Sequence, residues 1–143
     1  MDYISQFEKI LDSNYRLIAM ESYDVERIID VFTRLTRFTN KAIYQWLPNQ
    51  GMHRIGASHI IIPRTQSAKN VLEHVDNSPH YGVFVLRDFN AAMQDKECLA
   101  LLKRIMAPSA AHKVIVLLGE TVELPAELKP FTLRSRHQLR HAS

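Results

Sequence analysis

Apolar residues follow two alternating patterns along this 143-residue chain. Runs that are apolar throughout or nearly so, which are typical of strands buried on both faces of a parallel sheet, occur at residues 15–20, 42–47, 81–86 and 114–118. Apolar positions spaced three or four residues apart, which indicate amphipathic helices, occur at residues 3–11, 24–37, 68–76 and 91–106. Strands and helices therefore alternate, and this order predicts an α/β domain built on a mostly parallel sheet.

The predicted sheet has four to five strands with helices on both faces, as in a degenerate P-loop NTPase-like fold. The fifth strand would be residues 59–62, although Pro63 favours an edge position or an extended connection there. No repeat or linker divides the chain. We therefore expect a single α/β domain at residues 1–131, followed by a basic C-terminal tail at residues 132–143.

Charge changes this picture only near the C-terminus. The sequence has 18 basic and 15 acidic side chains, and Arg134, Arg136 and Arg140 account for the excess. These arginines are candidate phosphate contacts, while the alternative is a solvated chain end. A nucleic-acid surface needs several basic groups on one ordered face, so nucleic acid is a weak candidate partner.

The single cysteine, Cys98, shares a helical apolar pattern with Leu101, Leu102 and Ile105. This pattern predicts a buried thiol in a reducing compartment. No stretch approaches the ~18 apolar residues of a membrane span, and the N-terminus does not resemble a signal peptide. We expect a soluble cytoplasmic protein that makes no membrane contact.

Ligands of open parallel sheets bind beyond the carboxyl ends of the strands. The candidate site residues at these positions are Glu21, Trp46, Asp88 and Glu120. Asp88 could position magnesium or accept a phosphoryl group, but helix capping or a turn is the simpler interpretation. For Trp46, packing in the core or at a sheet edge is favoured over stacking on a base, because no second aromatic strand pattern supports stacking.

A nucleotide-hydrolysing domain needs a phosphate-binding loop after the first strand, with backbone amides, a lysine and a magnesium-binding hydroxyl. Residues 20–24 read Met-Glu-Ser-Tyr-Asp instead, without glycine or lysine and with carboxylates that repel phosphate. None of the chain's four glycines belongs to a phosphate-binding fingerprint, and none of its seven histidines belongs to a strong metal-ligand motif. The sequence therefore predicts no catalytic residue, no cofactor and no metal.

Residues 16–27 resemble the opening strand, acidic turn and Glu-Arg helix of a family of AAA-type ATPases, first described as a hypothetical chloroplast reading frame and widespread in bacteria. Further similar blocks are residues 43–46 with Gly51, and residues 82–89, 113–118 and 122–128. The resemblance covers about residues 14–131. The resemblance implies a non-catalytic domain whose sheet is similar to that of the ATPase but which has no Walker loop. In that family the domain is N-terminal and precedes the ATPase module.

Two functions follow from these observations. The first is a non-catalytic interaction or regulatory domain that binds a protein partner or a second copy of itself. The alternative is a nucleotide- or nucleic-acid-binding module that uses the strand ends and the basic tail.

Overall fold

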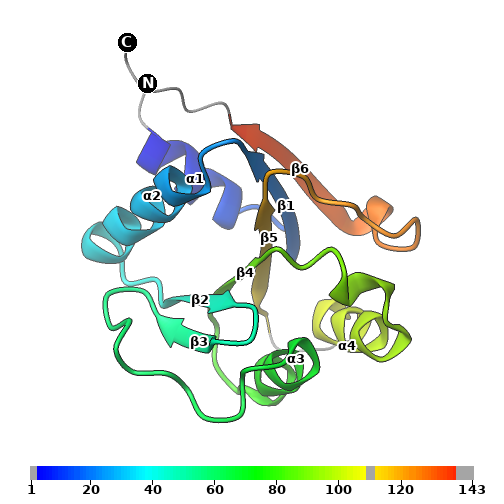
Figure 1. The fold of residues 1–143 in the computed structure, drawn as a ribbon. Coiled ribbons are helices and arrows are strands. Elements are labelled where there is room, and N and C mark those ends of the chain that lie inside the picture. Colours follow the sequence, from blue (N-terminus) through cyan, green and yellow to red (C-terminus); the bar gives the residue numbers. More distant parts are fainter. Residues whose placement is uncertain (1–2, 109–111, 138–143) are drawn as a thin grey trace.

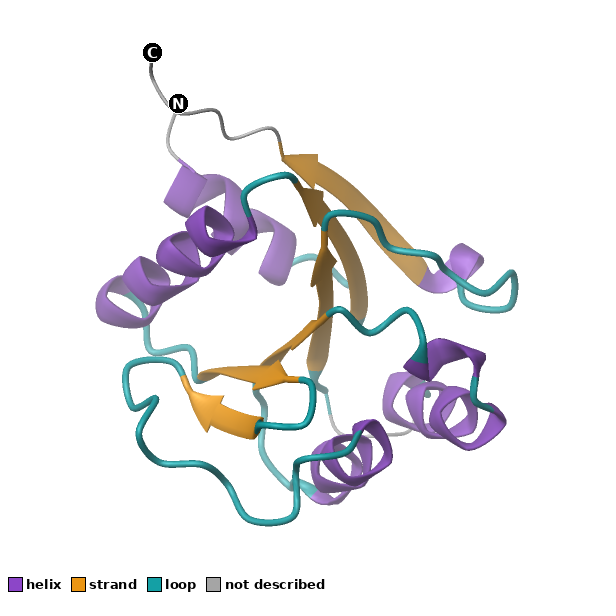
Figure 2. Cartoon of the chain, viewed as in Figure 1, coloured by secondary structure: helices purple, strands orange, loops and turns teal. Residues whose placement is uncertain are grey.

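The computed structural model describes residues 3–108 and 112–137, which form an α/β fold of three layers (Figure 1 and Figure 2). Helices α1 (Tyr3–Leu11) and α2 (Val25–Phe38) pack on one face of a central sheet. Helices α3 (Ala68–Asn77) and α4 (Lys96–Met106) pack on the other. The predicted α/β class with helices on both faces is confirmed. None of the described helices is long and apolar enough to cross a bilayer.

The described residues form six strands in one sheet. The strands are β1 (Leu17–Ser22), β2 (Ile43–Leu47), β3 (Gly51–Arg54), β4 (Val83–Arg87), β5 (Val114–Gly119) and β6 (Thr132–His137). Their order across the sheet is β3-β2-β4-β5-β1-β6. Only β3 runs antiparallel to its neighbour. The sheet is thus mostly parallel as predicted, but it has six strands rather than four to five.

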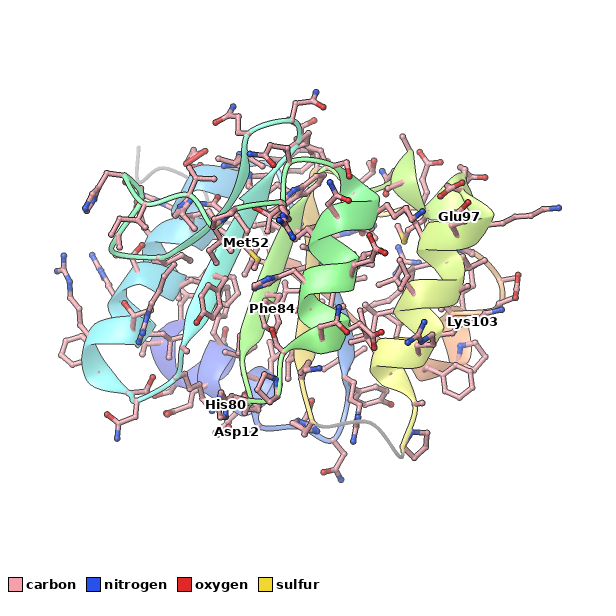
Figure 3. The ribbon with its side chains drawn as sticks, turned by 90° about the horizontal axis from the view of Figure 1, so that it is seen from below. Asp12, Met52, His80, Phe84, Glu97 and Lys103 are labelled. Atoms are coloured by element: carbon pink, nitrogen blue, oxygen red, sulfur yellow. The ribbon has the colours of Figure 1, made fainter. Side chains whose placement is uncertain are left out.

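Each face of the sheet contributes to its own apolar cluster. Successive side chains of a strand point to opposite faces, so Leu17 and Ala19 of β1 pack with α3 and α4, whereas Ile18 and Met20 pack with α1 and α2. Figure 3 shows α3 and α4 over one face, with Phe84 of β4 close to α3. Burial on both faces is the reason that the central strands are continuous apolar runs.

Strand β3 and the segment after it differ from the expectation. Residues 59–62, the candidate fifth strand, form no strand, whereas Gly51–Arg54 pairs with β2. The loop after β3 instead packs along its outer edge. The Ile62 N–H donates to the Met52 carbonyl (2.8 Å), and the Met52 N–H donates to Thr65 Oγ1 (2.9 Å).

Strand β6 occupies residues that the sequence analysis placed in the tail. Thr132–His137 pairs in parallel with β1 over its whole length. The chain reaches it from β5 through residues 120–128 and the 3-10 helix η2 (Lys129–Phe131). Strand β1 is therefore flanked by β5 and β6, and the rest of the expected tail, residues 138–143, lies outside the described residues.

The predicted helix at residues 91–106 is interrupted near its start. A 3-10 helix, η1 (Ala92–Gln94), precedes Asp95, which has extended backbone angles and begins α4. The Asp95 carboxylate accepts a hydrogen bond from the Cys98 N–H (3.1 Å), as an N-cap does. The local capping preference of aspartate thus overrides the continuous apolar pattern.

Candidate functional site at the carboxyl edge of the sheet

The loops after β1, β4 and β5 enclose a cleft. These three strands are neighbours in the sheet. The chain passes from β1 to α2 on one face and from β4 to α4 on the other, so the loops diverge at this edge. The cleft has a volume of about 560 Å³ and is lined by residues 23–26, Arg87, Asp88, Asn90, Glu120 and Thr121.

The turn between β1 and α2 occupies the place of a phosphate-binding loop. Ser22 Oγ accepts a hydrogen bond from the Asp24 N–H (3.1 Å), and Asp24 Oδ1 accepts one from the Arg27 N–H (3.2 Å). Phosphate binds helix N-termini through their free amides and the positive end of the helix dipole. Here the chain's own carboxylate caps the helix and places a negative charge at that end.

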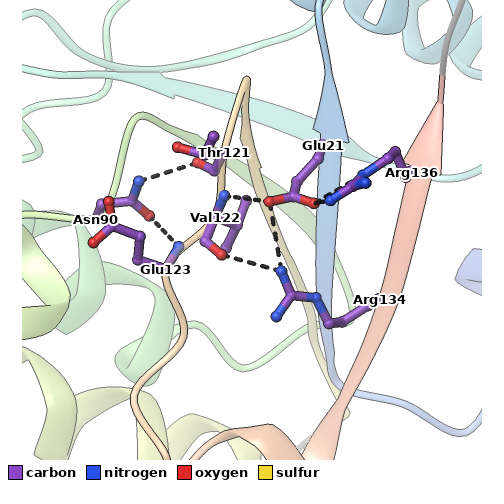
Figure 4. Close-up of polar contacts among 7 residues, drawn as sticks. All are labelled: Glu21, Asn90, Thr121, Val122, Glu123, Arg134 and Arg136. Atoms are coloured by element: carbon purple, nitrogen blue, oxygen red, sulfur yellow. Dashed lines mark hydrogen bonds and ion pairs between the residues drawn. The ribbon is translucent and has the colours of Figure 1, made fainter.

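Glu21, the residue that precedes this turn, is held in a cluster of polar contacts (Figure 4). Its side chain is 11% exposed. Glu21 Oε2 accepts a hydrogen bond from the Val122 N–H (2.8 Å), and Oε1 accepts two from Arg136, from Nη2 (3.0 Å) and Nε (3.3 Å). Arg134 Nη2 contacts Glu21 Oε2 (3.5 Å) and the Val122 carbonyl (3.3 Å). Glu21 therefore joins β1 to β6 and to the loop after β5.

The surroundings of Glu21 favour its charged form. The hydrogen bond from the Val122 N–H lowers the pKa of Glu21, and Arg136 and Arg134 lower it further against the opposing effect of burial. Within the described part of the chain, two arginines thus face one carboxylate. Glu21 is an internal ion-pair partner rather than an open ligand-binding group.

Asp88 and Glu120 are exposed at the cleft. Asp88 has φ of 52° and donates its N–H to the Leu118 carbonyl (3.0 Å). A Cβ at Gly119 would lie 3.4 Å from Asp88 Oδ1 and 3.2 Å from the Thr121 carbonyl, so this glycine allows the two loops to approach closely. Neither carboxylate makes a hydrogen bond or ion pair with another described residue.

Asn90 bridges the loop after β4 to the loop after β5 (Figure 4). Its Nδ2 donates to the Thr121 carbonyl (3.0 Å), and its Oδ1 accepts from the Glu123 N–H (2.9 Å). The Asn90 side chain thus satisfies the Thr121 carbonyl and the Glu123 N–H, which lie in a segment without regular secondary structure. This bridge fixes one wall of the cleft.

Among the described residues that line the cleft, Arg87 is the only basic one. It forms an ion pair with Glu26 Oε1 (2.8 Å) and donates to Gln45 Oε1 (3.1 Å). Gln45 Nε2 in turn lies 3.4 Å from His53 Nε2, and burial lowers the pKa of His53. Because Glu26 neutralises Arg87, the carboxylates of Asp88 and Glu120 leave the described lining of the cleft with a net negative charge.

Trp46 lies in the core, away from this cleft. It is 4% exposed, and its Nε1 donates to the Thr65 carbonyl (2.7 Å). Its ring meets Phe89 edge to face, with 5.4 Å between the ring centroids. The indole therefore connects β2 to the loop that covers β3.

The structure brings only part of the predicted set together. Asp88 and Glu120 line one cleft, Glu21 lies beside it in its own cluster, and Trp46 is buried in the core and does not line the cleft. Arg134 and Arg136 belong to strand β6, and Arg140 lies outside the described residues. No group of three or more described His, Cys, Asp or Glu residues is placed to hold a metal ion.

Several residues of this edge were not singled out from the sequence. Arg87, Asn90 and Tyr23 line the cleft, and Tyr23 is 81% exposed. The partners of Asn90 lie more than thirty positions away along the chain. The one signal that was available is position, because each of these residues lies within four positions of the end of a predicted strand.

The fold and this edge define a class of protein, an α/β domain with a mostly parallel six-stranded sheet and no phosphate-binding loop in the described turn after β1. A family model described as the SpoVK-like AAA ATPase, N-terminal domain, matches residues 3–134. The chain belongs to this family. The match confirms the resemblance to the N-terminal domain of an AAA-type ATPase. No curated protein matches the sequence.

Proposed function

We propose that this chain is a non-catalytic interaction or regulatory domain, which binds a protein partner or a second copy of itself and neither binds nor hydrolyses nucleotide. The observation that carries the proposal is the turn after β1. There Asp24 Oδ1 accepts the Arg27 N–H, so a carboxylate occupies the end of α2 where phosphate would otherwise bind. Family membership supports the proposal, because the matching model describes an N-terminal domain.

Electrostatics add a second argument. The described lining of the cleft carries the exposed carboxylates of Asp88 and Glu120, and the one arginine of that lining is already paired with Glu26. A nucleotide phosphate would meet uncompensated negative charge there, at a cost that a loop of amides and a lysine normally removes. The alternative function through the tail arginines has less support, because Arg134 and Arg136 already contact Glu21.

Nucleotide binding and turnover test this proposal. Isothermal titration of the full chain with ATP and magnesium is expected to give no binding heat, and phosphate release is expected to equal the rate without protein. ATP turnover that is abolished by Asp88→Ala would overturn the non-catalytic assignment. Light scattering of the same sample over a range of concentrations then separates a second copy from a different protein as the partner.

A further inference from the structure

The two edges of the sheet differ in how they are covered. At the β3 edge, the N–H and carbonyl of Met52 are both bonded by the following loop, through Thr65 and Ile62. At the other edge, β6 has β1 as its only neighbouring strand among the described residues. Figure 1 shows β6 as the outermost strand on its side of the sheet. Among the described residues, therefore, further backbone hydrogen bonds close the β3 edge, and no strand covers the β6 edge.

The open edge offers backbone groups to a further strand. Alternate peptide groups of a strand at the edge of a parallel sheet point away from its neighbour. Such groups are a template for an added strand, and proteins often disable it with proline, a bulge or charged side chains, so the charges of β6 restrict which strand it can accept. Strand β6 contains no proline and pairs with β1 residue by residue, without a bulge.

The side chains of β6 differ between its two faces. Arg134 and Arg136 pair in register with Ala19 and Glu21 and lie on the Glu21 face. Leu133 lies on the opposite face, where it packs with the apolar cluster of α1 and α2. A strand added beside β6 would thus meet two arginines on one face and the apolar side chain of Leu133 on the other.

The basic face carries more positive charge than the carboxylate of Glu21 neutralises. The two guanidinium groups share the single carboxylate of Glu21, and the side chains of Arg134 and Arg136 are 48% and 70% exposed. Each guanidinium carries five N–H donors in a planar fork that suits carboxylates. Carboxylates at positions of an incoming strand opposite these arginines would complete this charge balance.

A second copy of the chain fits this edge poorly. If two β6 strands paired about a two-fold axis, their arginines would lie side by side on one face. Like charges directly opposite one another on paired strands are destabilising. The charge pattern therefore favours a different, acidic partner.

We propose that β6 accepts an extended segment of a partner protein as an additional strand, with acidic residues opposite Arg134 and Arg136 and an apolar residue beside Leu133 on the α1 side. This inference rests on the proposed interaction function and names the chemistry of the partner. Main-chain hydrogen bonds would supply affinity, and the alternating side chains would supply specificity.

Synthetic peptides test the proposal on the full chain. The probe is a capped, fluorescent peptide in which Glu and Val alternate. The control is the same peptide with Lys in place of each Glu. The Glu peptide is expected to bind and to slow hydrogen exchange of the backbone amides in residues 132–137, whereas the Lys peptide does neither. Equal binding of both peptides, or protection only outside β6, would overturn the proposal.

Two matched sets of variants separate strand addition from simple charge attraction. Arg136→Glu is expected to weaken binding of the Glu peptide by about tenfold or more, since charge reversal opposes the paired carboxylate. Arg54→Glu, at an exposed arginine of the opposite edge strand, is expected to leave binding unchanged. The circular dichroism melting curve of each variant shows whether it is folded.

In an added strand, every second amide of the peptide would donate a hydrogen bond to β6. N-methylation of these amides should abolish binding, whereas N-methylation of the amides between them, which point away from β6, should not. Unchanged binding of both methylated peptides contradicts strand addition even if a protein variant fails to fold. Exchange protection of β6 that grows with protein concentration in the absence of peptide would assign the edge to a second copy. A lack of peptide binding without ATP turnover refutes this inference alone, whereas turnover refutes the proposed function.

Discussion

Glu21 shows how one side chain can connect distant parts of this chain. Its carboxylate accepts the Val122 N–H and pairs with Arg134 and Arg136 of β6. Replacement with alanine leaves a buried amide without its acceptor and two arginines without a counter-charge. Loss of a buried acceptor costs about 1–3 kcal/mol, so Glu21→Ala should lower the free energy of unfolding by about that amount, measured by urea denaturation.

Glu120→Ala is the matched control, because that carboxylate is exposed at the same edge of the sheet. It should change stability by less than about 0.5 kcal/mol, as is usual for surface positions. If both substitutions cost the same, Glu21 does not stabilise the edge through its contacts.

The Glu21 contribution should also depend on pH. Its pKa is lowered in the folded protein from the ordinary value of 4.5. A carboxyl group of this kind stabilises the fold fully above its unfolded pKa and loses that effect as pH falls through the folded pKa. The difference in stability between the wild type and Glu21→Ala should therefore be constant near neutral pH and shrink below about 4.5.

At the level of elements, the N-terminus of α2 is the part that separates this domain from a nucleotide-binding one. The Asp24 carboxylate caps the helix through the Arg27 N–H. Asp24→Ala should therefore destabilise the protein by about 1 kcal/mol, whereas Asp24→Asn, with an equally good cap, should cost much less. Urea denaturation of the two variants measures this difference. ATP binding gained by Asp24→Ala would show that the carboxylate alone excludes phosphate.

The predicted elements succeed where burial is local and repetitive. Strands β4 and β5 and helices α1 and α2 lie close to their expected positions, because each buries an apolar pattern that the sequence displays directly. Strand β3 has only four residues and follows a turn, so it carries too little pattern to detect. Strand length and apolar content thus decide which elements can be predicted.

Strand β6 was missed for a different reason. Its alternating arginines are typical of a solvated tail, and the carboxylate that holds them, Glu21, lies more than a hundred positions earlier in the chain. Contacts between distant residues also limited the prediction of the candidate site. The missing phosphate loop is visible in residues 20–24, but the polar clusters around Glu21 and Arg87 depend on contacts between elements distant in sequence.

At the scale of the whole molecule, Cys98 provides a built-in probe of unfolding. It is the only cysteine and is 3% exposed in the core. Burial, followed by the neighbouring Asp95, raises its pKa to about 11, so the thiolate is scarce at neutral pH. Iodoacetamide should label the folded chain far more slowly than the urea-unfolded chain. Equal rates in both states would show that Cys98 is accessible in the folded state.

The parallel pairing of β1 has a consequence for the order in which the chain can fold during synthesis. Leu17 of β1 pairs with Ile115 on one side and with Thr132 on the other. A ribosome therefore releases this fully buried, apolar strand long before either neighbour has been translated. Contacts between residues so distant in sequence slow folding and prolong the exposure of apolar segments that are prone to aggregate. The nascent chain should consequently depend on chaperones until residues 132–137 have emerged.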